Sequence, residues 1–162
     1  MTVINHQDKV SILIPAYNKR FFKTALKSAL SQTYQNLEII VCDDSESGSI
    51  RKIVKKFKTD RLRYFKNEKN LGFSANFTKC FEMANGEYIK YLNDDDLLQK
   101  ECVQLMVNMF HSGGPEIKLV FSKRAIIDDR GQKQTDNPMN ASLSPTDTRI
   151  NGAELADHVL KN

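Results

Sequence analysis

The chain has 162 residues, of which 40% are hydrophobic and 27% charged, with 24 Lys and Arg against 20 Asp and Glu. This length fits one domain, and the composition excludes a disordered, fibrous or disulfide-framed protein. A net charge of +4 does not predict a nucleic-acid or bilayer partner. No apolar run approaches the roughly 20 residues of a membrane span, and the N-terminus lacks a signal-peptide core. The three cysteines lie far apart in the chain, which indicates buried thiols in a reducing cytosol.

Short apolar runs alternate with amphipathic segments along most of the chain. The β-branched runs predict buried strands at residues 10–14, 37–42, 62–65, 87–92 and 117–122. Apolar residues at helical spacing predict helices at residues 21–30, 49–57, 74–84 and 99–110. This alternation predicts an α/β fold with a mainly parallel sheet and helices on both faces.

The last part of the chain differs in composition. Residues 128–151 are polar and contain Gly131, Pro138 and Pro145, which predicts a long loop, or at best a weak hairpin around residues 129–131. A new helix is expected to start at about Gly152. We therefore expect an α/β domain over residues 1–127, followed by a polar loop and the start of a helix over residues 128–162.

Polar clusters follow three of the predicted strands. They are Ala16-Tyr17-Asn18, Asp43-Asp44-Ser45 and Asn93-Asp94-Asp95-Asp96. In an open parallel sheet, ligands bind at the carboxyl ends of the strands, near the point where the strand order reverses. The three clusters are therefore expected to converge on one rim of the sheet.

The triple aspartate points to a cation. Adjacent carboxylates repel one another, and a hard divalent ion such as Mg²⁺ or Mn²⁺ would stabilise them. Two other interpretations stay open: a solvated acidic turn, or Asp96 as the N-cap of the next helix.

Asp44 and Tyr17 suit a nucleoside. An acidic residue after the second strand often binds a nucleoside in doubly wound folds, and an exposed tyrosine ring can stack on a base. A capping or solvated role for Asp44 and an edge-packing role for Tyr17 stay open. The absence of a G-x-G-x-x-G motif after the first strand, and of a P-loop motif anywhere, counts against a dinucleotide-binding fold and a P-loop NTPase.

Other polar features of the sequence are less specific. The histidines are not spaced as metal ligands, and Cys42 inside a strand is interpreted as an inert core thiol. A run of lysines is interpreted as the solvated face of the second helix rather than a nucleic-acid patch: Lys52, Lys55, Lys56 and Lys58.

With these residues in place, the sequence resembles the inverting family 2 glycosyltransferases, which have the GT-A fold and use nucleotide-diphospho-sugar donors. The resemblance runs from about Val10 to Phe121. It is carried by four segments in the usual order and spacing: Val10–Asn18, Leu30–Ser45, Asn70–Asn76 and Asn85–Asp96. This sequence has Ala75 where the family often has arginine, and Asn93 in the first place of the D-x-D motif.

The resemblance implies roles for individual residues. Tyr17 would stack on the base of the donor, Asp44 would accept a hydrogen bond from a base N–H, and Asp94 would lie near the ribose and the diphosphate. Asp95 would bind the divalent cation, Mn²⁺ or Mg²⁺. The expected residues of the nucleotide-sugar site are therefore Pro15, Tyr17, Asn18, Asp44, Asn76 and Asp94, with Asp95 as the metal ligand.

The same resemblance implies an enzyme that transfers a sugar from a UDP-sugar to an acceptor hydroxyl with inversion, in cell-envelope or extracellular polysaccharide synthesis. The acceptor would be a glycan or a lipid-linked molecule, and the location cytoplasmic or peripheral at the inner face of the membrane. The catalytic base is unknown and expected beyond Asn162, so we expect a chain cut off within its acceptor half. The alternative is a non-catalytic nucleotide-sugar-binding module or fragment that lacks the base.

Overall fold

A computed structural model describes residues 8–135, 146 and 148–155 of the chain. It divides into two units, residues 1–120 and residues 121–162. The boundary expected from composition was at residues 127 and 128. The two units are described separately below.

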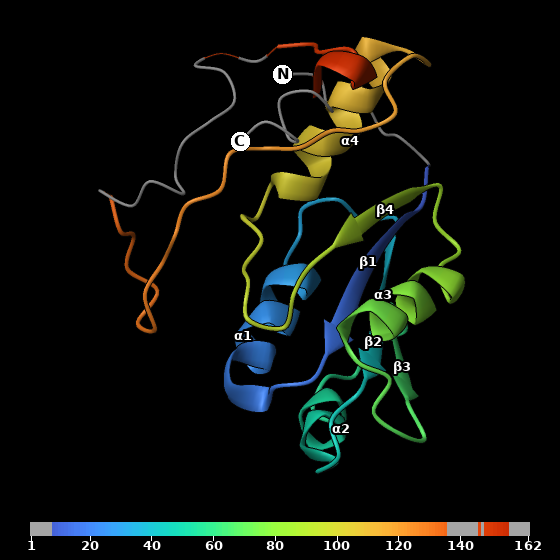
Figure 1. The fold of residues 1–162 in the computed structure, drawn as a ribbon, viewed down its shortest axis with the longest axis vertical. Coiled ribbons are helices and arrows are strands. Elements are labelled where there is room, and N and C mark those ends of the chain that lie inside the picture. The colour runs from blue at the N-terminus through green and yellow to red at the C-terminus, as the bar shows by residue number, and fades with distance from the viewer. Residues whose placement is uncertain (1–7, 136–145, 147, 156–162) are drawn as a thin grey trace. The chain divides into compact units, whose positions relative to one another are not determined.

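Parallel strands and helices alternate along the first unit, as the sequence predicts (Figure 1). The elements are β1 (Val10–Ala16), α1 (Lys19–Leu30), β2 (Leu37–Asp43), α2 (Ser49–Val54), β3 (Leu62–Lys66), α3 (Phe73–Glu82), β4 (Tyr88–Tyr91) and α4 (Cys102–Gly113). The strand order is β3-β2-β1-β4, and every pair is parallel. In space, β1 lies between β2 and β4. The strand order therefore reverses at β1, and the switch point lies at its carboxyl end.

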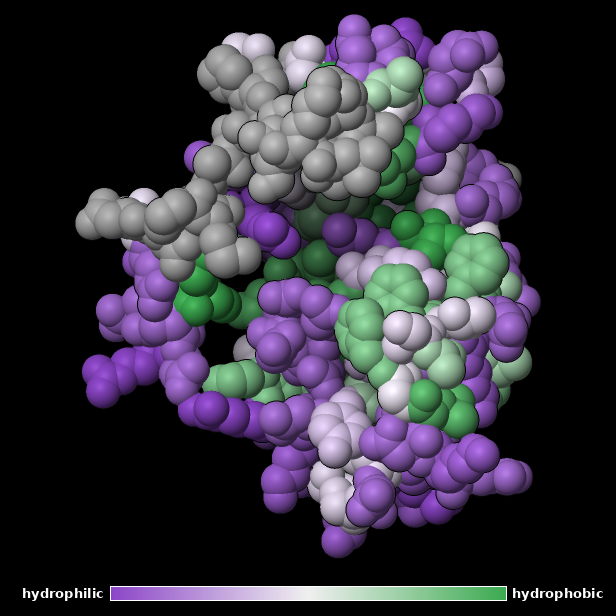
Figure 2. Space-filling view, viewed as in Figure 1, coloured by the Kyte–Doolittle hydropathy of each residue, from purple (hydrophilic) through white to green (hydrophobic). Residues whose placement is uncertain are grey.

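The strands are buried because successive side chains enter two different apolar layers. On one face, alternate residues of β1 and β2 pack with α1, α2 and α4, as shown by Ile12, Phe22, Ile39, Ile50 and Val107. On the other face, the intervening residues pack with α3, as shown by Leu13, Ile40, Cys42 and Cys80. Hydrophobic residues also gather on the outer surface over α3 (Figure 2), where Phe73 and Phe81 are exposed.

The prediction of a fifth strand at residues 117–122 is wrong. These residues have no regular structure. After α4 the chain turns at Gly114 and Pro115, and the Ile117 amide donates to the Gly114 carbonyl at 3.1 Å. An apolar run becomes a strand only where a neighbouring strand supplies hydrogen-bond partners, and the described part of the chain offers none here.

All four helices differ by a few residues from their predicted extent, and the differences are largest in α2 and α4. Helix α2 ends at Val54, and α4 begins at Cys102 with Glu101 as its N-cap residue. Asp96 is therefore not the N-cap of α4, and that interpretation is wrong. Its carboxylate instead accepts a hydrogen bond from the Asn93 side chain at 2.9 Å, within a turn.

The second unit contains the predicted weak hairpin. Ile127 and Lys133 form an antiparallel bridge, and the Asp128 carboxylate accepts from the amides of Arg130 and Gln132 at 2.9 and 2.8 Å. Residues 152–155 are helical, which confirms the start of the last helix. The rest of that helix, and most of the polar loop before it, lie outside the described residues.

Candidate functional site

The loops after β1, β2 and β4 meet at the carboxyl edge of the sheet. The Asp44 amide donates to the Ala16 carbonyl at 2.8 Å, which joins the ends of β1 and β2. The Asp94 carboxylate accepts from the amides of Tyr17 and Asn18, both at 2.7 Å. The structure thus brings together the three polar clusters that the strand-end rule predicts on one rim.

Through its two hydrogen bonds, Asp94 connects the loop between β1 and α1 to the loop after β4. Asn18 is also the N-cap of α1, because its side-chain oxygen accepts from the Arg20 amide at 2.9 Å. Burial raises the pKa of Asp94 above its usual value, and so does the charge of Asp95, although the two amide bonds oppose this rise. The Asp94 charge is therefore poorly solvated in the free protein.

Asp44 is buried and held by the loop before α3. Its Oδ1 accepts from the Leu71 amide and its Oδ2 from the Gly72 amide, at 2.8 and 2.9 Å. Gly72 has φ of +80°, a left-handed conformation that glycine adopts without strain. The Asn67 side chain is a third donor, so one of the about four acceptor positions of the ionised carboxylate is left for a further donor.

Asn67 is the residue that sequence reasoning missed. Its Nδ2 donates to Asp44 Oδ1 at 2.8 Å and to Asn76 Oδ1 at 2.9 Å. Asn76 in turn donates to the Cys42 carbonyl at 3.0 Å. Asn67 immediately follows β3, so the rule used for the other strand ends would have found it. Its own Oδ1 is buried without a hydrogen-bond partner in the described structure.

The other predicted residues differ in exposure. Pro15 is buried inside β1, whereas the Tyr17 side chain is 61% exposed and Asp95 lies at the surface. Asp43 has a structural role, because its carboxylate accepts from the Ser45 hydroxyl and the Tyr64 hydroxyl, both at 2.6 Å. Burial and this bond to Asp43 raise the pKa of Tyr64.

The acidic loop after β4, residues 93–96, can hold a divalent cation only if a bound ligand supplies further oxygen atoms. The described residues contain no group of three or more His, Cys, Asp or Glu side chains placed to hold a metal ion. Mg²⁺ and similar ions, however, are commonly held by one or two carboxylates with substrate phosphates and water completing the shell. Asp95, beside the poorly solvated Asp94, supplies that kind of oxygen donor.

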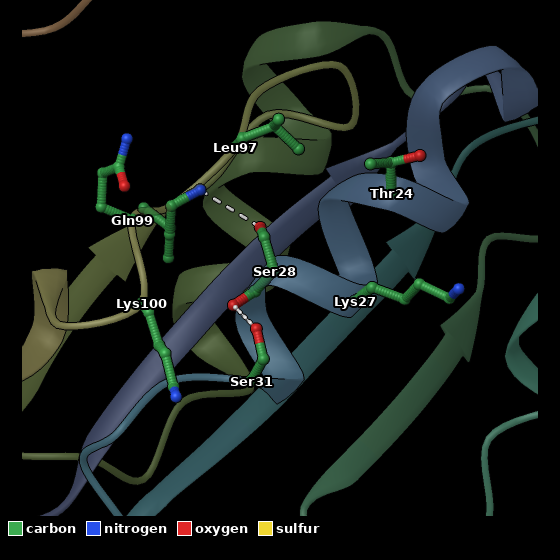
Figure 3. Close-up of a pocket in the computed structure, with 8 residues that line it drawn as sticks. Thr24, Lys27, Ser28, Ser31, Leu97, Gln99 and Lys100 are labelled. Atoms are coloured by element: carbon green, nitrogen blue, oxygen red, sulfur yellow. Dashed lines mark hydrogen bonds between the residues drawn. The ribbon is translucent and has the colours of Figure 1, made fainter. Parts of the chain in front are cut away.

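The first unit also has a shallow depression whose lining includes none of the predicted site residues. It measures about 590 Å³ and lies between α1 and residues 97–100 (Figure 3). Ser28 is one of its lining residues (Figure 3), and its hydroxyl accepts a hydrogen bond from the Leu98 amide at 3.1 Å. Two lysines and no carboxylate are among its lining residues, which disfavours a cation there, and the strand-end loops remain the candidate site.

The sequence of this chain is similar to those of known proteins. The model of Glycosyl transferase family 2 matches residues 11–158. An Escherichia coli protein, "UDP-Glc:alpha-D-GlcNAc-diphosphoundecaprenol beta-1,3-glucosyltransferase WfaP", is 42% identical over 88 residues, covering 54% of this chain and 35% of that protein. An uncharacterized glycosyltransferase of Rickettsia felis is 33% identical over 131 residues, covering 78% of this chain and 21% of that protein. The chain therefore spans about a third of the first of these relatives and about a fifth of the second.

Solved structures agree with the fold. The crystal structure of S. aureus TarS, residues 1–349, has a TM-score of 0.59 and 25% identity, covering 64% of this chain and 32% of that one. The parallel sheet and its helices thus form the GT-A fold, as the resemblance implied. With the family match over most of its length, the chain belongs to glycosyl transferase family 2.

Proposed function

We propose that the chain forms the donor-binding part of an enzyme that transfers a sugar from a UDP-sugar to an acceptor hydroxyl with inversion. The observation that carries this proposal is the meeting of two carboxylates at one sheet edge. Asp44 is held by Asn67 and by the loop before α3, and Asp94 fixes the loop that bears Tyr17.

The base of the donor is bound between Tyr17 and Asp44 in this proposal. The exposed Tyr17 ring stacks on the base, and the remaining acceptor position of Asp44 takes its N–H. Asn76 does not contact the donor directly, because both ends of its amide bond to protein groups. It acts by holding Asn67, and through Asn67 the Asp44 carboxylate.

Asp95 is the metal ligand of the proposal. A bound Mn²⁺ or Mg²⁺ would offset the charge on the departing nucleoside diphosphate. Asp94 places its charge beside Asp95 while anchoring the loop between β1 and α1. Neither Asp44 nor Asp94 suits the role of general base, because backbone amides already occupy part of each carboxylate.

The acceptor class is inferred from relatives. WfaP is named for a diphosphoundecaprenol-linked acceptor, and a Campylobacter jejuni relative, 30% identical, is named for a diNAcBac-PP-undecaprenol acceptor. We infer a lipid-linked glycan acceptor and a role in cell-envelope polysaccharide assembly, at the inner face of the membrane. Among the described residues, none of the helices combines the length and apolar character needed to cross a membrane.

Titration calorimetry with UDP in the presence and absence of Mn²⁺ tests this proposal. We expect binding that depends on Mn²⁺ and is lost in Asp95→Ala. Glu82→Ala is the matched control, because it removes an exposed carboxylate at the end of α3, far from the strand-end loops. Unchanged UDP binding in Asp95→Ala would contradict the metal assignment. Release of UDP from a UDP-sugar in water would support an enzyme over a module that only binds.

A further inference from the structure

Positive charge is concentrated on the outer surface of α1, of α2 and of the turn that follows α2. Residues 19–30 contain four Lys or Arg, residues 49–58 contain five, and neither segment contains Asp or Glu. The two helices contact each other and pack on the same apolar layer of the sheet. We call the Lys and Arg side chains of these two segments the basic face. Figure 2 shows hydrophilic residues over α2 and the lower end of α1.

The charges of the basic face are turned to solvent and are mostly unneutralised. All of its side chains are exposed. Apart from Arg20, whose guanidinium lies 4.8 Å from the centre of the Phe21 ring, none of them forms an ion pair with another described residue. So many like charges on adjoining helices raise the local potential well above what the net charge suggests. Such a surface attracts an anionic partner.

The chemistry of the basic face favours a lipid surface over a nucleic acid. Single-stranded nucleic acids are bound by exposed aromatic rings that stack on bases. Within residues 19–30 and 49–58, Phe22 is fully buried, and Phe21 and Phe57 are half-buried, so these segments carry no exposed ring. The exposed Tyr17 lies before them, at the candidate site. Clusters of four to eight Lys or Arg on a helix are typical of binding to anionic phospholipids.

We propose that the basic face binds the headgroups of anionic phospholipids and holds the protein on the bilayer surface. The choice of a bilayer rests on the proposed function, in which the acceptor is lipid-linked. The face begins at the candidate site, because α1 starts directly after Asn18, whose amide binds Asp94. Adsorption through α1 and α2 would therefore bring the donor-binding edge to the membrane where that acceptor lies.

Co-sedimentation with phosphatidylcholine vesicles, with and without phosphatidylglycerol, tests the proposal. We expect binding only to the anionic vesicles, weakening steeply as salt rises. The combined variant Lys23→Gln, Lys27→Gln, Lys52→Gln and Lys55→Gln should lower the partition coefficient about a thousandfold. The matched control removes the same charge elsewhere, with Lys79→Gln, Lys118→Gln, Lys123→Gln and Lys133→Gln, and should bind nearly as well as the unmodified chain.

Two results would overturn the proposal. One is equal loss of vesicle binding in both combined variants, since net charge alone would then explain adsorption. The other is tighter binding to a DNA oligonucleotide than to anionic vesicles at the same salt, with loss in the first variant only. UDP binding measured without vesicles stays independent of these outcomes, so failure of the lipid proposal is distinct from failure of the proposed function.

Discussion

A single buried amide, that of Asn67, organises the candidate site at the scale of residues. It donates to both Asp44 and Asn76 while its own oxygen has no partner in the described structure. A buried unsatisfied oxygen costs stability, and such groups in native proteins call for an explanation. The explanation here is that Asn67 holds Asp44 in its orientation, because no other described side chain donates to that carboxylate.

Replacing Asn67 should therefore disturb binding more than folding. In Asn67→Leu, Asp44 and Asn76 each lose a donor, but the unpaired oxygen is also removed, so we expect a stability loss of only about 1 kcal/mol. The affinity for UDP should fall about tenfold, since each lost charge-assisted bond is worth roughly 1.5 kcal/mol or more. Calorimetry and urea unfolding measure the two effects.

Asn108→Leu on the exposed face of α4 is the control for the Asn67 prediction. Among the described residues, the Asn108 side chain bonds only to the Gln104 side chain. UDP affinity should be unchanged in this variant. Wild-type affinity in Asn67→Leu would show that Asp44 needs no positioning from Asn67.

Glu38 is a second buried charge, at the opposite end of the sheet. Burial alone would raise its pKa. Hydrogen bonds from the Ser11 hydroxyl, the Asn85 amide and Arg63, together with the charge of Lys9, outweigh that effect and lower the pKa to about 2 from 4.5. Because the folded pKa lies below the unfolded value, ionised Glu38 stabilises the protein above pH 4.5, and this stabilisation is lost as the pH falls toward 2.

Glu38→Gln should accordingly be destabilised at neutral pH by about 3 kcal/mol, the free energy that corresponds to this pKa difference. The gap between the variant and the unmodified chain should narrow as the pH drops below 4.5. Urea unfolding at pH 7 and pH 3 measures it, with the exposed Glu82→Gln as control. A gap that does not change with pH would contradict the role given to Glu38.

At the scale of elements, the backbone before β4 passes so close to the backbone of β1 that one position is restricted to glycine. Gly86 precedes β4, and a Cβ atom there would lie 2.5 Å from the Ser11 amide nitrogen and 2.8 Å from the Lys9 carbonyl oxygen. Its amide also donates to the Ser11 hydroxyl at 2.8 Å. Only glycine lets β4 reach its place beside β1.

Gly86→Ala should destabilise the first unit by about 2 kcal/mol, the usual cost of overpacking against a rigid neighbour. Gly152→Ala is the matched control, because a Cβ atom there would meet nothing within 4 Å. Thermal unfolding should shift downward in the first variant and stay unchanged in the second. Equal midpoints would mean that β4 can move away from β1 without cost.

The sequence predicts the elements best where packing and periodicity agree. β1 and β2 are recognised from their apolar runs because both faces of each strand are buried. Residues 117–122 carry a similar run but lack a described partner strand, and partner strands are long-range features. The start of α4 is misplaced because Glu101, its N-cap, makes no side-chain cap bond and so leaves little trace in the sequence.

The site is partly predictable for a related physical reason. Strand ends can be located from the sequence, so the meeting of Tyr17, Asp44 and Asp94 follows from topology. The contacts around Asp44 depend on the backbone conformation of Gly72, which no local pattern encodes. They also depend on the Asn67 amide, whose position after β3 follows from the sequence but whose contact with Asp44 does not. The binding mode of Asp44 therefore needs the structure.

At the scale of the whole molecule, all candidate site residues lie in the first unit. The two apolar layers also consist only of residues from that unit. We predict that residues 1–120 alone fold cooperatively and bind UDP with the affinity of the full chain. Calorimetry and thermal unfolding of this fragment check the prediction, and a loss of UDP affinity would assign part of the donor site to residues 121–162.

Asn18 belongs to two structures at once, since it caps α1 with its side chain and binds Asp94 with its amide. One residue thus connects the helix of the basic face to the donor site. By thermodynamic linkage, whatever factor membrane adsorption applies to donor affinity, donor binding must apply to membrane affinity. If adsorption raises donor affinity, a protein loaded with its donor remains longer on the bilayer, and release of the spent nucleotide favours its departure.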